Sequence, residues 1–285
     1  MMKILLFSLL AFALLFSDET QGYVFGMNFN NDITMDIESV VEYSQGSFDF
    51  YMLFSARQLW EFEKPSISSN KTKLTQTFKT VVSSMRRNDE MKPNHDVQKL
   101  TGTSYTITID SLGYIESTVG NSELAQEVVE ESETVNWLFG INTEQNNIKY
   151  FMGGDTLRNV GDVWTTSDTT FDADETFGFE KFKGSQINKA VYSFKKIKEK
   201  KGDLIAWVDC RATLDVNGVG VSWDDTVEFS QIGEFKGFVK INITKGYMVL
   251  NKMNGAMQLK GKSLENDKTW NATIDVSLKQ KGKIK

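Results

Sequence analysis

The side chains that most often carry out catalysis are scarce in this sequence. Its 285 residues include one histidine, His95, and one cysteine, Cys210. His95 lies in the polar stretch Lys92-Pro93-Asn94-His95-Asp96, which lacks the strand-to-helix elbow that presents a nucleophile. Because His95 and Cys210 are far apart and unaccompanied, the usual nucleophilic triads and zinc ligand sets are excluded. We therefore expect a protein that is not an enzyme, with no catalytic residues, no metal and no cofactor.

Carboxylates are the remaining chemical candidates, and four of them cluster along a short stretch. Their oxygens could bind calcium, but the EF-hand spacing, with its central glycine and terminal glutamate, is missing. Two carboxylates across a cleft could also serve a glycosidase, although the sequence places no pair at the required separation. A solvated acidic loop is the simpler interpretation. The four residues are Asp168, Asp172, Asp174 and Glu175.

The sharpest local signal is the motif Val160-Gly161-Asp162-Val163-Trp164. In a binding site, Trp164 would stack on a sugar or a lipid headgroup. As a structural element, Gly161 and Asp162 would reverse the chain while Trp164 fills the core. The usual roles of turn glycines and buried tryptophans favour the structural interpretation, and the ligand-binding residues therefore stay unknown.

Alternating apolar and polar residues predict a mainly β protein. One hairpin pattern, a strand followed by a turn with Gly-Tyr and a return strand, occurs at Tyr105–Ser117 and again at Lys240–Leu250. Between them, Leu124–Leu138 has helical periodicity, an acidic outer face and Asn121 or Ser122 as N-cap. We expect curved antiparallel β-sheet, either two similar half-barrel lobes or one extended sheet, with one amphipathic helix around 122–139.

The domain boundaries follow from these elements. A basic start and the apolar run Ile4–Phe16 are typical of a signal peptide, since the run is shorter than the roughly 20 residues that cross a bilayer. We predict a signal peptide over 1–22, a first β lobe over 23–120, a connecting or covering helix over 121–140 and a second β lobe over 141–285. Export to the periplasm or the extracellular space is expected, without a membrane span and without lipid attachment through a Cys. Cleavage after Ser17 and cleavage after Gly22 both stay open.

Charge and cysteine usage narrow the range of partners. The formal net charge of −6 opposes binding to phosphate backbones, so nucleic acid is excluded as a partner. The basic stretch Lys181–Lys201 is the one candidate patch, but its lysines crowd a predicted turn, which indicates a solvated loop. A single cysteine forms no intrachain disulfide, and Cys210 stands in an alternating run, where a small buried hydrophobe is expected.

The order of these features resembles a family of uncharacterised exported proteins of Bacteroidetes-type bacteria. Members show Ile-Asp-x-x-Gly before a return strand, then an acidic helix, a Val-Gly-Asp-x-Trp box and a second strand-Gly-strand unit. Here these are Ile109–Gly113, Glu123–Leu138, Val160–Trp164 and Val239–Leu250, although Thr244 to Gly246 lack the aspartate expected at the second turn. The resemblance implies a curved antiparallel sheet wrapping a helix, similar to lipid carriers of the LolA kind, and it implies no firm function.

Binding without catalysis is the expected function. A curved sheet closed by the helix Leu124–Leu138 would enclose an apolar concavity. We expect the protein to carry or sense a lipid-like or other apolar small molecule; its protein partners are unknown. The alternative is a structural or adhesive β-domain of the cell envelope or surface, which would need exposed sheet edges or an apolar surface patch. Methionines from several strands would line the concavity adaptably: Met27, Met35, Met52, Met248, Met253 and Met257.

Overall fold

Strands built on period-two alternation make up most of the chain that the computed structural model describes. The described residues are 22–23, 33–45, 50–63, 71–87, 90–93, 95–111, 115–126, 156–174, 179–222 and 225–284. The strands are β1 Ile33–Gln45, β2 Phe50–Glu63, β3 Thr72–Arg87, β4 Glu90–Pro93, β5 Ser104–Ile109, β6 Ile115–Gly120, β7 Val163–Asp174, β8 Lys181–Lys200, β9 Asp203–Ser222, β10 Asp225–Asn242, β11 Tyr247–Ser263 and β12 Thr269–Ile284. The helix α2, which is one turn long, spans His95–Gln98.

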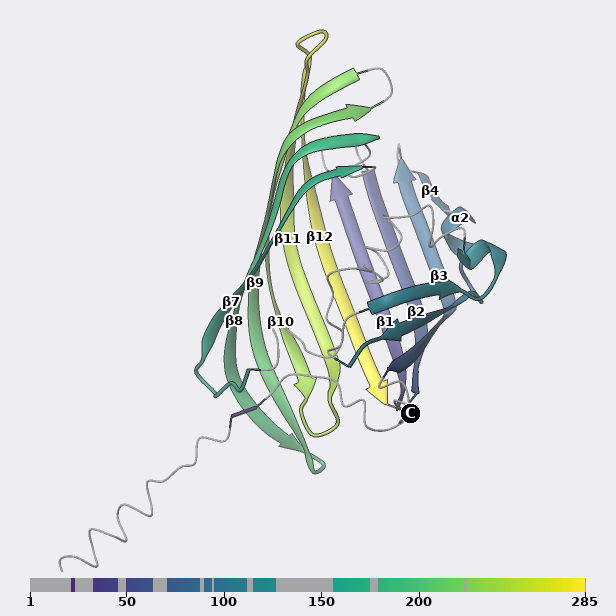
Figure 1. Ribbon diagram of the computed structural model, residues 1–285, viewed down its shortest axis with the longest axis vertical. Coiled ribbons are helices and arrows are strands. Elements are labelled where there is room, and N and C mark those ends of the chain that lie inside the picture. The colour runs from purple at the N-terminus through teal and green to yellow at the C-terminus, as the bar shows by residue number, and fades with distance from the viewer. Residues whose placement is uncertain are drawn as a thin grey trace, which may run out of the picture.

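All the strands belong to one antiparallel, curved sheet (Figure 1). Its order is β6-β5-β3-β2-β1-β12-β11-β10-β9-β8-β7, and β4 pairs with β3 beside this path. The sheet has two parts, one made of β1 to β6 and the other of β7 to β12. They meet where β1 pairs with β12, from Met35 opposite Ile284 to Ser44 opposite Asp275. The mainly β fold is therefore confirmed, in the form of one extended sheet, while the predicted lobe boundaries stay a prediction.

The two similar hairpins occupy different places in this sheet. The β5–β6 hairpin lies at one edge, whereas the β10–β11 hairpin lies inside the sheet with neighbours on both sides. Both have a register shift beside the turn, between Thr108 and Ile109 in one and between Lys240 and Ile241 in the other. The shared sequence pattern thus corresponds to a shared local geometry and not to equivalent positions.

Four residues at the start of the predicted helix lie within the described part of the chain. Residues 123–126 are helical, and the backbone N–H of Ala125 donates to Oγ of Ser122 at 3.2 Å, which makes Ser122 an N-cap. Residues 127–140 lie outside the described residues, so the rest of this helix stays a prediction. Within the described part of the chain, no helix has the length and apolar character needed to cross a membrane.

The inner face of the sheet carries three buried hydrophobic clusters. Leu214 of β9 contacts the first and the third cluster and so links the two parts of the sheet. The first cluster is centred on β1, β2, β3 and β5 and includes Met35, Ile37, Phe54, Phe62, Leu74, Phe78, Tyr105, Ile107, Ile109, Met257 and Val276. The second comprises Trp164, Phe194, Ala206, Val208, Val239 and Ile241, and the third Phe179, Phe182, Val216, Val227 and Phe229.

Candidate binding surface

The structure separates the predicted chemical candidates from one another. His95 is exposed in α2, and Cys210 is buried in β9. The acidic stretch is not the expected loop, because Asp168, Asp172 and Asp174 lie in β7, where a high content of Thr together with Val, Trp and Phe favours a strand; Glu175 lies outside the described residues. Among the described side chains, no three His, Cys, Asp or Glu residues are placed to hold a metal ion.

The Val160–Trp164 motif forms a turn with a buried ring. Gly161 has a φ of 101°, and Asp162 Oδ2 accepts a hydrogen bond from the backbone N–H of Asn159 at 2.8 Å. The Trp164 side chain is 7% exposed, and its ring stacks on Tyr192 with the centroids 5.4 Å apart. The ring is therefore enclosed in the second cluster, as the structural interpretation predicts.

The lysine-rich stretch is a strand and not a solvated loop, so that prediction is wrong. Residues Lys181 to Lys200 form β8, and a register shift between Phe194 and Lys196 changes its alternation. Beyond the shift, Lys196 is the partner of Trp207 and Lys198 is the partner of Ile205. The shift therefore turns these two lysines toward the outer face of the sheet.

On that outer face the lysines surround a pair of aromatic rings. The rings of Trp207 and Phe238 are stacked, with centroids 6.1 Å apart and an interplanar angle of 12°. Three ammonium groups lie around the indole ring, at 3.7 Å for Lys240, 4.6 Å for Lys196 and 6.0 Å for Lys198. Lys252 pairs with Phe238 from the next strand. We call these six residues together the basic–aromatic surface: Lys196, Lys198, Trp207, Phe238, Lys240 and Lys252.

The charges of this surface are not balanced by nearby acids. The single acid among the neighbouring outward positions of β9, Asp209, lies 3.8 Å from Lys195. In the described part of the chain, no carboxylate oxygen lies within 4.0 Å of the ammonium group of Lys196, Lys240 or Lys252. Burial lowers the pKa of Lys240, and repulsion by the surrounding lysines lowers it further. An anion placed here would relieve that repulsion.

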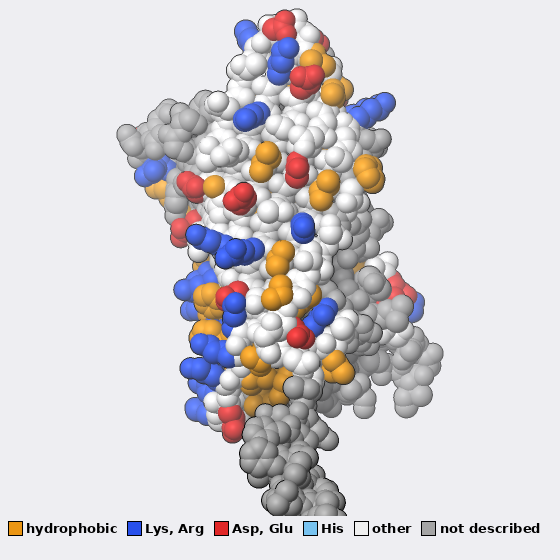
Figure 2. Space-filling view, turned by 90° about the vertical axis from the view of Figure 1, so that its left-hand side faces the viewer, with side chains coloured by type: hydrophobic (Ala, Val, Ile, Leu, Met, Phe, Trp, Pro, Cys, Tyr) orange, Lys and Arg blue, Asp and Glu red, His pale blue; other side chains and the backbone are white. Residues whose placement is uncertain are grey.

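More cations extend the surface across the sheet. The register places them outward on neighbouring strands, and all are exposed. Figure 2 shows Lys and Arg side chains gathered with hydrophobic ones along the lower left margin of the outer face. The further cations are Arg211, Lys236, Lys279 and Lys281.

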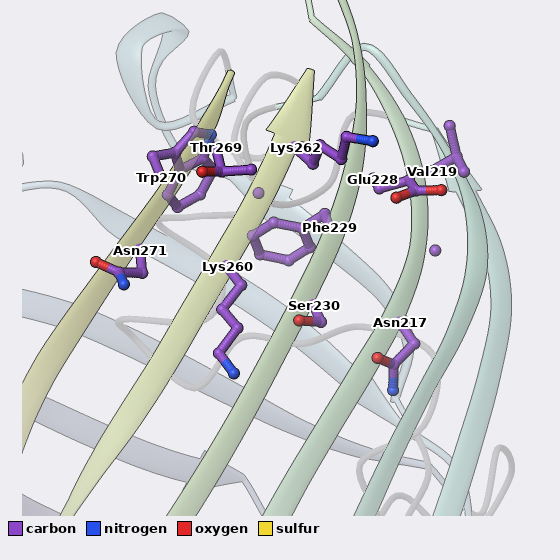
Figure 3. Close-up of a pocket in the computed structure, with 12 residues that line it drawn as sticks. Asn217, Val219, Glu228, Phe229, Ser230, Lys260, Lys262, Thr269, Trp270 and Asn271 are labelled. Carbon is purple, nitrogen blue, oxygen red and sulfur yellow. The ribbon is translucent and has the colours of Figure 1, made fainter. Parts of the chain in front are cut away.

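A separate cavity of about 640 Å³ lies near the other ends of β9 to β12 (Figure 3). Two cross-strand rows line it, Asn217 with Ser230, Lys260 and Asn271 in one row, and Val219 with Glu228, Lys262 and Thr269 in the other. The row between them consists of Gly218, Phe229, Gly261 and Trp270, and the Phe229 ring of this row belongs to the third buried cluster on the inner face. The cavity therefore offers amides, hydroxyls and charges of both signs, which suit a hydrogen-bonding ligand.

The sequence contains a partial signal for the basic–aromatic surface. Lys196, Lys198 and Lys200 recur with the period of a strand, but the aromatic rings and Lys240 come from other strands, and only the register shows that they meet. Comparison with protein-family models and with curated protein sequences finds no match to this chain.

Proposed function

We propose that this chain is a non-enzymatic, exported binding protein that holds the anionic headgroup of a lipid-like ligand on the basic–aromatic surface. One observation carries the proposal, namely the three ammonium groups within 6.0 Å of the Trp207 ring centre. Lysine ammonium groups attract phosphate and carboxylate, and a Trp–Phe stack offers an apolar contact to the adjoining carbon atoms. An anionic amphiphile satisfies both parts of the surface at once.

The proposal places the ligand on the outer face and not under the predicted helix. The expected concavity beneath Leu124–Leu138 falls mainly on residues outside the described ranges, so it supports no site. On the inner face, methionines such as Met35 and Met257 are members of the first hydrophobic cluster. They act there as core residues, and the charged outer face is the better candidate.

Calorimetry with a short-chain phosphatidylglycerol, used below its micelle concentration, tests this function. We expect binding that weakens with salt and exceeds binding of the matching phosphatidylcholine, because the contact is between opposite charges. The triple variant Lys196→Gln, Lys198→Gln, Lys240→Gln should bind at least about tenfold more weakly. The matched control replaces three exposed lysines in the first half of the same strand: Lys181→Gln, Lys183→Gln and Lys189→Gln. Equal binding by the two triple variants would overturn the proposal.

A structural or adhesive β-domain is the second candidate, and the sheet edge favours it. β7 is the last strand of the sheet and, among the described strands, pairs only with β8. Val163 and Phe171 on this edge strand are 64% and 69% exposed. An edge of this kind can accept a further strand. If adhesion is the function, Ser167→Pro should abolish partner binding and leave lipid binding intact.

A further inference from the structure

The basic–aromatic surface is broader than one headgroup. From Lys196 on β8 to Lys281 on β12, the register crosses four strand spacings, which is about 19 Å. Six lysines lie outward over this width, one of which, Lys281, lies 4.0 Å from an oxygen of Glu38, and a headgroup with one or two charges cannot contact all of them. The six are Lys196, Lys198, Lys240, Lys252, Lys279 and Lys281.

The basic–aromatic surface is also separate from the cavity, and its composition favours an extended partner. Trp207 lies ten residues along β9 from Asn217, which lines the cavity, so the two sites are about 33 Å apart. The basic–aromatic surface lies on the outer face of the sheet, away from that cavity, with Trp207, Phe238 and Lys240 half-buried among exposed lysines. Aromatic rings with a lysine rim match the interface of a bilayer, where the rings enter the headgroup layer and the lysines meet acidic lipids.

We infer that the outer face of β8 to β12 docks onto the surface of an anionic lipid bilayer, with Trp207 and Phe238 at the centre of the contact. This inference rests on the proposed function and adds that many headgroups are engaged at once. Charge complementarity carries it, because in a chain of net charge −6 the register gathers these lysines on one face of the sheet. Each lysine near an acidic membrane adds to the attraction, so the contact depends on the whole face.

Vesicle co-sedimentation with the full chain tests the inference. We expect binding to vesicles containing about 30% phosphatidylglycerol, no binding to pure phosphatidylcholine, and a loss of about 100-fold in the triple variant at Lys196, Lys198 and Lys240. The control variant at Lys181, Lys183 and Lys189 should bind vesicles like the parent chain. Every variant retains the apolar run Ile4–Phe16, so the contribution of that run cancels in the comparison.

Two further measurements decide between a bilayer and other partners. Brominated lipid should quench the tryptophan fluorescence of the parent chain more than that of Trp207→Phe, because the ring enters the interface. If short-chain phosphatidylglycerol binds with the expected lysine dependence but vesicles do not, the bilayer inference is overturned and the proposed function stands. If neither ligand depends on these lysines, both fail. Polyglutamate binding as tight as vesicle binding, with no effect of Trp207→Ala on either, would show a general polyanion site and also overturn the inference.

Discussion

The Nζ atom of Lys240 lies 3.7 Å from the centre of the Trp207 ring, and the two residues are direct partners across β9 and β10. Lys196 approaches the same ring from β8. The cation–π attraction of the ring is therefore shared by ammonium groups that repel one another. That repulsion acts between groups near solvent, so it is sensitive to ionic strength.

Salt should therefore stabilise the folded chain through this surface. Raising salt from about 20 mM to about 200 mM screens the repulsion among exposed lysines. We expect the resulting gain in unfolding free energy to be about 0.5 kcal/mol smaller in Lys240→Gln than in the parent chain, the scale of one like-charge pair across strands. Urea unfolding at both salt concentrations measures it, with Lys189→Gln as the control. An identical salt response in all three proteins would contradict the argument.

A second prediction concerns a polar pair inside the first hydrophobic cluster. Oε1 of Gln58 accepts hydrogen bonds from Nε2 of Gln76 and from Nε1 of Trp60, both at 2.7 Å. Gln58→Leu leaves both donors without this acceptor and should lower the unfolding free energy by about 2 kcal/mol. Adding Gln76→Leu removes one of the two donors that lost their acceptor. The double variant should therefore lose less unfolding free energy than the sum of the losses in the two single variants. Urea unfolding of the three variants decides, and strict additivity would speak against the pair.

The buried thiol of Cys210 should be unreactive in the folded protein. Burial raises its pKa from 9.0 to about 11, which lowers the thiolate fraction at neutral pH by about a hundredfold. We expect slow reaction with Ellman's reagent in native buffer and rapid reaction with one equivalent after unfolding in guanidinium. Cys210→Ser serves as the blank. Complete labelling of the native protein within seconds would mean that the thiol is accessible.

Acid should weaken the contact between the β8–β9 turn and the β10–β11 turn. The Asp203 carboxylate accepts a hydrogen bond from Nδ2 of Asn242 at 2.9 Å and lies 3.0 Å from Nζ of Lys245. The Lys245 ammonium group and then the Asn242 amide lower the pKa of Asp203 below 3.8. Its stabilisation is thus present above pH 3.8 and is lost as the pH falls through the lowered pKa.

The measurement for Asp203 compares urea midpoints at about pH 6 and about pH 2.5. The midpoint of the parent chain should fall more than that of Asp203→Asn, since the variant has no carboxylate to protonate. Asp209→Asn, at an exposed position elsewhere on β9, is the control. If Asp203→Asn and the parent chain lose the same stability in acid, this carboxylate does not contribute.

Short sequence patterns predict those parts of the fold that depend on interactions between residues close together in the chain. Alternation identified the strands, the glycine turns identified both hairpins, and Ser122, one of the two expected N-cap residues, accepts a hydrogen bond from the backbone N–H of Ala125. Trp164 fills a cluster because a buried indole next to a Gly-Asp turn is a local arrangement. In each case the signal and its cause lie within a few residues of one another.

The candidate surface could not be predicted, because it depends on register between distant residues. Lys196, Trp207 and Lys240 meet only when three strands align, and a one-residue shift in β8 decides which face its lysines take. The sequence places these lysines near a predicted turn, and that position favours a loop. In the structure the lysines belong to the strand itself, since β8 continues to Lys200.

The pairing of β1 with β12 has a consequence for how the chain reaches its folded state. Met35 finds its partner Ile284 almost at the other end of the sequence, so the centre of the sheet cannot close until the last strand has left the ribosome. At about 5 to 20 residues per second, β1 waits for more than ten seconds with one edge unpaired. During that interval one edge of the nascent β1–β3 segment stays unpaired, and synthesis itself sets the earliest moment at which the sheet can close.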